Sequence, residues 1–259
     1  MLENIIKAYD IRGLVKNEIT PDFSFALGVA FAKFLEQERE PATIVVGEDM
    51  RESSPQLADA FTDGATSQGM DVIRIGLAST DMLYFASGKL NLPGIMFTAS
   101  HNPASYNGMK FSRAGAKGIG LDSGLAAIRD RAQSYFESSI EAVADQGHIE
   151  EINLTREYVE YLRKLVDLSQ TRRLKIVVDA AHGAAYQIAP KVFHELGAEV
   201  IAIGCSPDGL NINKGVGATH PEALVQAVKD HRADYGIALD GDADRLQFVD
   251  ASGRLFNGD

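Results

Sequence analysis

The sequence predicts an α/β fold made of two similar three-layer α/β domains with mixed, mostly parallel sheets. Two observations support this prediction. Short, almost uniformly apolar runs, such as residues 43–47 and 175–179, alternate with longer segments of helical periodicity. Runs of that kind are typical of parallel strands covered by helices on both faces. The length of 259 residues fits one large or two ordinary domains.

The first domain is expected to span residues 1–140. Its first helix begins at Thr20-Pro21-Asp22 and ends near Gln37, because threonine caps a helix, proline suits the first helical position and an acid belongs in the first turn. Strands are expected over residues 5–9, 43–47, 72–75, 94–97 and 109–112, and further helices over residues 54–68, 80–89 and 122–137. The polar, weakly periodic residues 138–152 are expected to form a linker or domain edge.

The second domain is expected to span residues 153–259. A Gly/Asn-rich loop leads to a capped helix start at Thr219-His220-Pro221-Glu222, and this helix ends near His231. Strands are expected over residues 175–179, 199–203, 235–239, 246–249 and 254–256, and helices over residues 155–166 and 184–196. The last residues follow a hairpin turn with no terminal helix, so the chain is expected to be a piece of a longer protein.

Charge and cysteine content restrict the partners and the compartment. The formal net charge of -11 repels nucleic acid and anionic membrane surfaces, so neither is expected as a partner. It also repels phosphorylated metabolites, so a protein of this charge needs a metal or a few placed basic residues to bind them. Cys205 is the single cysteine, and residues 1–13 lack the pattern of a signal peptide. A cytoplasmic protein is therefore expected.

An acidic loop follows the apolar strand expected over residues 235–239. Asp240, Asp242 and Asp244 alternate with small residues, so in extended chain the three carboxylates would point to one face and repel each other. A divalent cation removes that repulsion, and hard oxygen ligands suit Mg²⁺. An EF-hand is excluded because its sixth position would be Arg245 instead of glycine. Arg245 either pairs with an acid or binds a phosphate.

A second polar loop follows the apolar strand expected over residues 94–97. It contains Ser100, a possible nucleophile, and His101, whose imidazole titrates near neutral pH. Lys110 begins the next strand and is a candidate general base. Each signal is modest alone. Together, a serine oxygen and a metal loop, each at a strand end of its own α/β unit, favour phosphoryl transfer through a phosphoserine.

These loops resemble those of a known family. The segments Thr98-Ala99-Ser100-His101-Asn102-Pro103 and Asp240-Gly241-Asp242-Ala243-Asp244-Arg245 are similar to the serine and metal loops of the α-D-phosphohexomutases. Residues 9–13 and 106–111 resemble the phosphomannomutase/phosphoglucomutase branch, whereas residues 211–222 are more similar to the phosphoglucosamine mutase branch. The resemblance covers essentially the whole chain.

The resemblance implies a mechanism and a set of site residues. A phosphohexomutase interconverts hexose 1-phosphate and hexose 6-phosphate, here of mannose or glucose, through a phosphoserine and a 1,6-bisphosphate. It implies the following roles: Ser100, His101, Lys110 and Arg245 are catalytic, Tyr9 and Arg12 bind the phosphorylated hexose, and Asp240, Asp242, Asp244 and Ser100 hold Mg²⁺. Arg51 matches a family motif but is interpreted as structural.

The sequence departs from the family in two places. Prolines usually flank the threonine at position 80, whereas this chain has Ser79 and Asp81, which puts the rigidity of that loop in question. The family has four domains and this chain holds the first two, so the missing C-terminal domains are a possible partner and the chain alone is expected to be inactive.

Two other interpretations remain open. The acidic loop is also compatible with an aspartyl-phosphate phosphatase that uses Asp240 or Asp242 as nucleophile, although Ala243 does not fit the usual motif. Alternatively, the chain is a non-catalytic half-enzyme that binds phosphosugar or a complementing partner.

Overall fold

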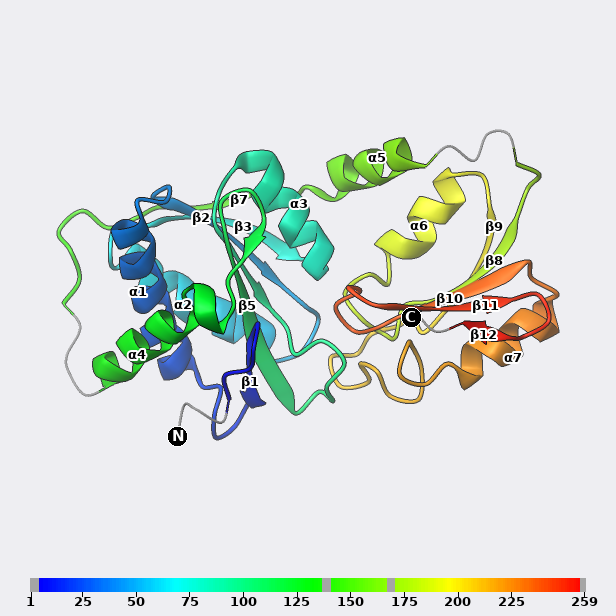
Figure 1. Cartoon of the computed structure of the whole chain (residues 1–259), viewed down its shortest axis with the longest axis horizontal. Helices are drawn as coiled ribbons and strands as arrows, with labels where there is room; N and C mark the ends of the chain where they lie inside the picture. The colour runs from blue at the N-terminus through cyan, green and yellow to red at the C-terminus, as the bar shows by residue number, and fades with distance from the viewer. Residues whose placement is uncertain (1–4, 137–140, 167–170, 257–259) are drawn as a thin grey trace. The chain divides into compact units, whose positions relative to one another are not determined.

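The computed structural model describes residues 5–136, 141–166 and 171–256 (Figure 1). The chain forms two compact units. Unit 1 comprises Met1–Ala99 and Ser105–Asn153, and unit 2 comprises Ser100–Ala104 and Leu154–Asp259. The short segment Ser100–Ala104 therefore belongs to unit 2, although the residues on both sides of it belong to unit 1.

Unit 1 is built on a mixed sheet. Its described strands are β1 (Ile11–Leu14), β2 (Thr43–Glu48), β3 (Asp71–Leu77), β4 (Gly94–Phe97), β5 (Tyr106–Arg113), β6 (Lys117–Gly118) and β7 (Ile149–Glu151). They run in the order β1-β5-β4-β2-β3-β7, with β6 paired to β5. Strands β4, β2, β3 and β7 are parallel, whereas β5 is antiparallel to β4, β1 and β6.

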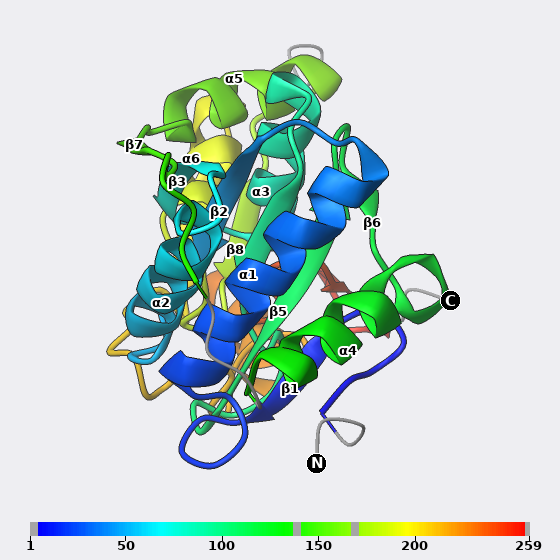
Figure 2. The same ribbon diagram turned by 90° about the vertical axis from the view of Figure 1, so that its left-hand side faces the viewer.

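Helices cover both faces of this sheet, as Figure 2 shows. They are α1 (Pro21–Glu38), α2 (Ser54–Thr66), α3 (Thr80–Leu90) and α4 (Leu125–Phe136), with a 3₁₀ turn, η2, at Leu121–Ser123. The core contains a contiguous aromatic cluster in which Phe31 of α1 lies 5.0 Å from Phe111 of β5, and Phe61 of α2 lies 5.7 Å from Phe97 of β4, between ring centroids. Such rings dominate the buried apolar area of a core.

Unit 2 is smaller and has its own mixed sheet. Its described strands are β8 (Lys175–Asp179), β9 (Glu199–Ile203), β10 (Tyr235–Leu239), β11 (Leu246–Asp250) and β12 (Leu255–Phe256), in the order β12-β11-β10-β8-β9. Strands β10, β8 and β9 are parallel, and β11 and β12 extend the sheet in antiparallel fashion. Helix α7 (Glu222–His231) covers one face and α6 (Ile188–Glu195) the other, while α5 (Thr155–Leu165) packs against α6.

The alternation of strands and helices confirms the predicted three-layer α/β class. The first helix begins where predicted, because the Thr20 side chain accepts a hydrogen bond from Phe23 N. Ser79 fills a similar role at α3, where its hydroxyl accepts from Met82 N, so this turn is fixed by a cap without flanking prolines.

Several predicted elements are wrong in detail. Residues 5–9 form no strand: Lys7 N donates to Asp10 O and Arg12 N to Ile5 O, which makes a tight turn that leads into β1. The helix predicted over residues 184–196 starts only at Ile188, because Ala181 and His182 have positive φ values of 55° and 50° and the chain turns there. Helix α7 has Pro221 at its cap position, with no side-chain cap bond.

One further difference concerns the edge of the unit 1 sheet. Strand β7, which was not predicted, lies in the expected linker and pairs with β3. Glu137 and residues 138–140, where the fourth helix was predicted to end and the linker to begin, lie outside the described residues. Within residues 5–136, 141–166 and 171–256, no helix is both long and apolar enough to cross a bilayer.

Candidate active site

The serine loop connects the antiparallel strands β4 and β5. Ser100 has a φ of 52°, a left-handed conformation that costs a non-glycine residue about 1–3 kcal/mol and persists only when neighbours fix it. Its side chain is buried, at 2% exposure, whereas His101 beside it is exposed. A serine held away from bulk water in a strained turn is typical of a reactive site.

The aspartate loop, residues 240–245, connects β10 to β11 as a tight hairpin turn. Ala243 has a φ of 63° and its amide donates to Asp240 O at 3.0 Å. The alternating sequence predicted that the carboxylates converge because the chain is extended. They do converge, but a turn brings them together instead.

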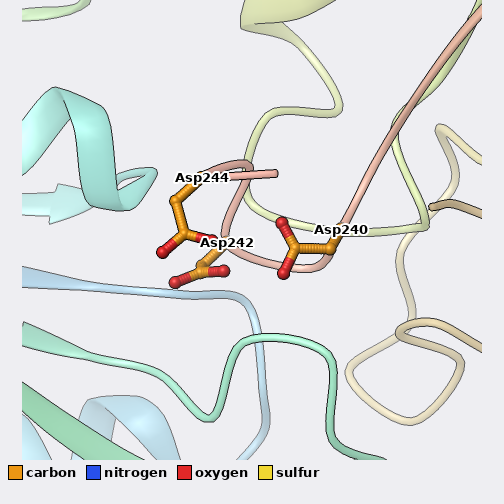
Figure 3. Close-up of side chains that lie close together, drawn as sticks. All are labelled: Asp240, Asp242 and Asp244. Atoms are coloured by element: carbon orange, nitrogen blue, oxygen red, sulfur yellow. The ribbon is translucent and has the colours of Figure 1, made fainter. Parts of the chain in front are cut away.

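The three carboxylates form a potential metal site (Figure 3). Asp240, Asp242 and Asp244 each offer an oxygen, and these atoms lie within 4.8 Å of one another. Asp240 and Asp242 are buried, at 1% and 0% exposure, and Asp244 is exposed. Clustered hard oxygens of which one reaches solvent suit Mg²⁺, which keeps water or a substrate oxygen in its shell. The donor set therefore fits the predicted ion.

The serine loop meets the aspartate loop within unit 2. Ser100 Oγ donates to Asp240 Oδ2 at 2.8 Å and accepts from Arg245 Nη2 at 2.7 Å. Arg245 Nη2 also donates to Asp240 Oδ2 at 2.6 Å and lies 2.5 Å from His101 Nδ1. The hydroxyl thus lies between a carboxylate and a guanidinium, with an imidazole next to the same guanidinium.

Electrostatics at this cluster are dominated by the buried acids. Burial, followed by the charge of Asp242, raises the pKa of Asp240 to about 6, although the hydrogen bond from Ser100 and the charge of Arg245 act in the opposite direction. One guanidinium therefore does not fully compensate the acidic loop. A cation would relieve the remaining repulsion.

Sequence reasoning missed a further residue that contacts the serine loop. Asn213, in the Gly/Asn-rich loop between β9 and α7, donates from Nδ2 to Ser100 O at 3.0 Å. Asp179, at the end of β8, has a structural role: its carboxylate is fully buried and accepts from Ala181 N at 2.9 Å and from Gly217 N at 2.8 Å. The left-handed propensity of asparagine is the only sequence signal that marked position 213.

The remaining predicted site residues belong to unit 1. Tyr9 is 80% exposed in the turn before β1. Arg12, on β1, forms an ion pair with Asp10 at 2.5 Å. Lys110 lies on β5 opposite Met96 of β4 and is half-buried. Their roles in a site stay predictions.

Arg51 supports the base of the serine loop from within unit 1. Its side chain is 1% exposed, and its Nε donates to Asp49 Oδ2 at 2.9 Å. Its Nη1 donates to the carbonyl of Tyr106, the first residue of β5, at 3.1 Å. A fully buried ion pair of this kind fits the structural interpretation of Arg51.

Comparison with known protein families accounts for both units. Residues 3–138 match the family described as phosphoglucomutase/phosphomannomutase, alpha/beta/alpha domain I, and residues 156–253 match alpha/beta/alpha domain II. The chain is 47% identical over 260 residues to a phosphoglucosamine mutase of Acidovorax ebreus and 48% identical over 264 residues to one of Methylibium petroleiphilum. Each alignment covers 96% of this chain and 56% of the relative, so the chain spans little more than half the length of these relatives.

Solved structures agree with this assignment. A crystal structure of a phosphoglucomutase/phosphomannomutase family protein from Burkholderia thailandensis superposes with a TM-score of 0.86 at 32% identity, covering 98% of this chain and 56% of that one. The open form of parafusin, a phosphoglucomutase from Paramecium, gives a TM-score of 0.74 at 20% identity, covering 95% of this chain and 52% of that one, and shares the fold alone.

Proposed function

The chain belongs to the phosphoglucomutase/phosphomannomutase family of α-D-phosphohexomutases, and on that premise we propose that it carries the phosphoserine and metal-binding part of a phosphosugar mutase. The reaction moves a phosphoryl group between the 1- and 6-positions of a hexose through a 1,6-bisphosphate. The observation that carries the proposal is the position of Ser100 Oγ between Asp240 Oδ2 and Arg245 Nη2.

The proposed chemistry follows from what these groups do to a phosphoryl group on Ser100. The serine Oγ–P bond breaks as a sugar hydroxyl oxygen forms a new O–P bond, and the proton of that hydroxyl passes to a base, for which Lys110 and His101 are candidates. Arg245 already donates to Ser100 Oγ, so its guanidinium is positioned to neutralise charge on the leaving oxygen. Mg²⁺, held by Asp240, Asp242 and Asp244 with the serine oxygen, would supply Lewis-acid neutralisation of the phosphoryl oxygens.

The preferred sugar is proposed from the relatives. Mannose and glucose phosphates were expected from residues 9–13 and 106–111. The relatives at 47–48% identity are phosphoglucosamine mutases, which supports an amino-hexose phosphate as the preferred substrate. The three sugars differ at carbon 2, so rates measured with the 1,6-bisphosphates of glucosamine, glucose and mannose under one set of conditions would rank them.

Phosphorylation of the chain itself tests the proposal. We expect incubation with Mg²⁺ and a hexose 1,6-bisphosphate to add one phosphoryl group by intact mass, and Ser100→Ala to abolish this gain. The adduct should be acid-stable, as a phosphoserine is. An adduct that hydroxylamine removes and that persists in Ser100→Ala would instead assign the nucleophile to an aspartate and favour the phosphatase interpretation.

The mutase reaction needs more than this chain. Because the relatives are almost twice as long, we expect the purified 259-residue chain to show little or no interconversion of hexose 1- and 6-phosphates in a coupled assay, even when Ser100 accepts a phosphoryl group. Turnover at the rate of a full-length relative assayed in parallel would contradict this expectation.

A further inference from the structure

The backbone of the serine loop is held by a side chain that takes no part in the proposed chemistry. Asn213 Nδ2 donates to the carbonyl oxygen of Ser100 at 3.0 Å and, at a longer 3.5 Å, to that of Asn102. The asparagine is 7% exposed, so these bonds are protected from water. They join residues 113 and 111 positions apart in the sequence.

The orientation of the Asn213 amide is fixed by its surroundings. Its backbone N–H donates to Ala181 O at 2.8 Å, and its φ of 58° is one that asparagine adopts more readily than most residues. Its Oδ1 is buried and has no hydrogen-bond partner within the described part of the chain. A flipped amide would place Oδ1 against two carbonyl oxygens, so only the present orientation is favourable.

Neighbouring residues are shaped to allow this contact. A Cβ atom on Gly241 would lie 2.5 Å from Ser100 O and 2.7 Å from Asn213 Nδ2, so glycine is needed where the two groups meet. The loop that carries Asn213 is tied to the end of β8, because Asp179 accepts a hydrogen bond from Gly217 N in that loop and another from Ala181 N, and Ala181 O accepts from Asn213 N. The hydrogen bonds from Asn213 to the serine loop, called the clamp below, are therefore supported by a buried carboxylate at the end of β8.

The contact with the carbonyl differs from the other bonds to Ser100 in one respect. The bonds to Asp240 and Arg245 use Oγ, and esterification of that oxygen removes the hydrogen that Ser100 donates to Asp240. The Asn213 bond uses the main-chain oxygen, an atom that esterification of Oγ does not change. It opposes relaxation of the left-handed Ser100 conformation whether or not the serine carries phosphate.

We propose that Asn213 is a positioning residue that fixes the main chain of Ser100 through both halves of the phosphoryl-transfer cycle. The inference rests on the proposed function for its catalytic consequence, but the clamp itself is a property of unit 2. Loss of the amide should leave the affinity for bisphosphate unchanged and slow the transfer step, because reacting groups displaced by about 1 Å lose up to ~100-fold in rate.

The test compares changes at two asparagines of one loop. Asn213→Asp replaces the donor with an oxygen, and Asn213→Gly removes the side chain at a left-handed position that glycine tolerates. Asn211→Asp is the matched control, because the Asn211 side chain bonds to Ser206 O and Asp208 N and not to the serine loop. Two quantities are measured: deuterium uptake in the peptide spanning residues 98–105 of the ligand-free chain, and the single-turnover rate of Ser100 phosphorylation by glucose 1,6-bisphosphate with Mg²⁺.

Both Asn213 variants should exchange faster in that peptide than the wild type. Their phosphorylation rate at saturating bisphosphate should fall by about 10–100-fold, while the half-saturating concentration stays within about twofold. Asn211→Asp should match the wild type in both. Asn213 variants with wild-type deuterium exchange and wild-type phosphorylation rates would overturn the proposal. Loss of cooperative melting in both Asn213 variants would also overturn it, because Asn213 would then be required for folding. A wild-type chain that accepts no phosphate from the 1,6-bisphosphates of glucosamine, glucose or mannose refutes the proposed function, while the exchange data still decide whether Asn213 holds the main chain of Ser100.

Discussion

The Asp240 carboxylate is buried beside Asp242 and also accepts hydrogen bonds from Ser100 and Arg245. Its raised pKa, about 6 against an unfolded value of 3.8, means that the folded chain binds a proton more tightly than the unfolded chain does. The stability that this proton contributes is complete below pH 3.8 and is lost as the pH rises to about 6. Above that pH the ionised Asp240 carboxylate lowers the free energy of unfolding of the metal-free chain.

Asp240→Asn should therefore stabilise the metal-free protein at pH 7.5. The expected gain in unfolding free energy is about 1–3 kcal/mol, since one pKa unit corresponds to about 1.4 kcal/mol. The gain should vanish near pH 4, where the wild-type carboxyl is protonated as well. Urea titrations in EDTA at the two pH values measure it. A variant less stable than wild type at pH 7.5 would show that the Arg245 pairing outweighs burial.

At the scale of helices, α1 and α2 pack with their backbones in contact. A Cβ on Gly28 would lie 2.1 Å from Phe61 O, and one on Gly64 would lie 2.1 Å from Phe25 O. The two glycines thus let each helix approach the main chain of the other, and this brings Phe31 and Phe61 together in the core.

Gly64→Ala should destabilise unit 1 by about 2 kcal/mol or more, because the added methyl group meets main chain that cannot move aside. Gly88→Ala in α3 is the control: its Cβ would have no neighbour closer than 4.0 Å. There alanine should stabilise by about 0.5–1 kcal/mol through helix propensity alone. Thermal melts of the two variants measure the contrast, and equal shifts would contradict a tight α1–α2 contact.

In the sheet of unit 1, strands in the middle were predictable and those at the edges were not, whereas the edge strands β9 and β12 of unit 2 lie within the ranges predicted for them. Strands β2, β4 and β8 are buried on both faces and read as continuous apolar runs. Strands β1 and β7 lie at the ends of the unit 1 sheet, and β7 is fully exposed with two glutamates, so its sequence carries no strand signal. The pairing of β7 is therefore decided by its neighbour β3 and not by its own residues.

At the candidate site, residues within local motifs were predictable and contacts between distant residues were not. Ser100 and the three aspartates follow apolar strands within short motifs, so local sequence predicts them. The contact between Asn213 and Ser100 O spans 113 residues and involves a backbone oxygen, which no local pattern records. Arg245 lay within the motif, yet its bonds to both Ser100 and Asp240 became visible only in three dimensions.

At the scale of the whole molecule, the metal should act as a stabilising ligand. Binding that is confined to the folded state adds RT ln(1 + [L]/Kd), or about 2.7 kcal/mol at a hundredfold excess over Kd. Mg²⁺ should therefore raise the melting temperature of the wild type. Asp242→Asn should remove that response, whereas Asp130→Asn, an exposed acid on α4, should retain it. A response that survives in Asp242→Asn would place the ion elsewhere.

Because Ser100–Ala104 belongs to unit 2, the two units cannot be separated by dividing the chain at a single position. The chain passes from one unit to the other after residues 99, 104 and 153. A gene segment that begins at residue 154 would encode the acidic turn without the hydroxyl that belongs to it, since Ser100 and Asp240 are 140 positions apart. Any continuous segment that keeps both Ser100 and Asp240 therefore contains residues of both units.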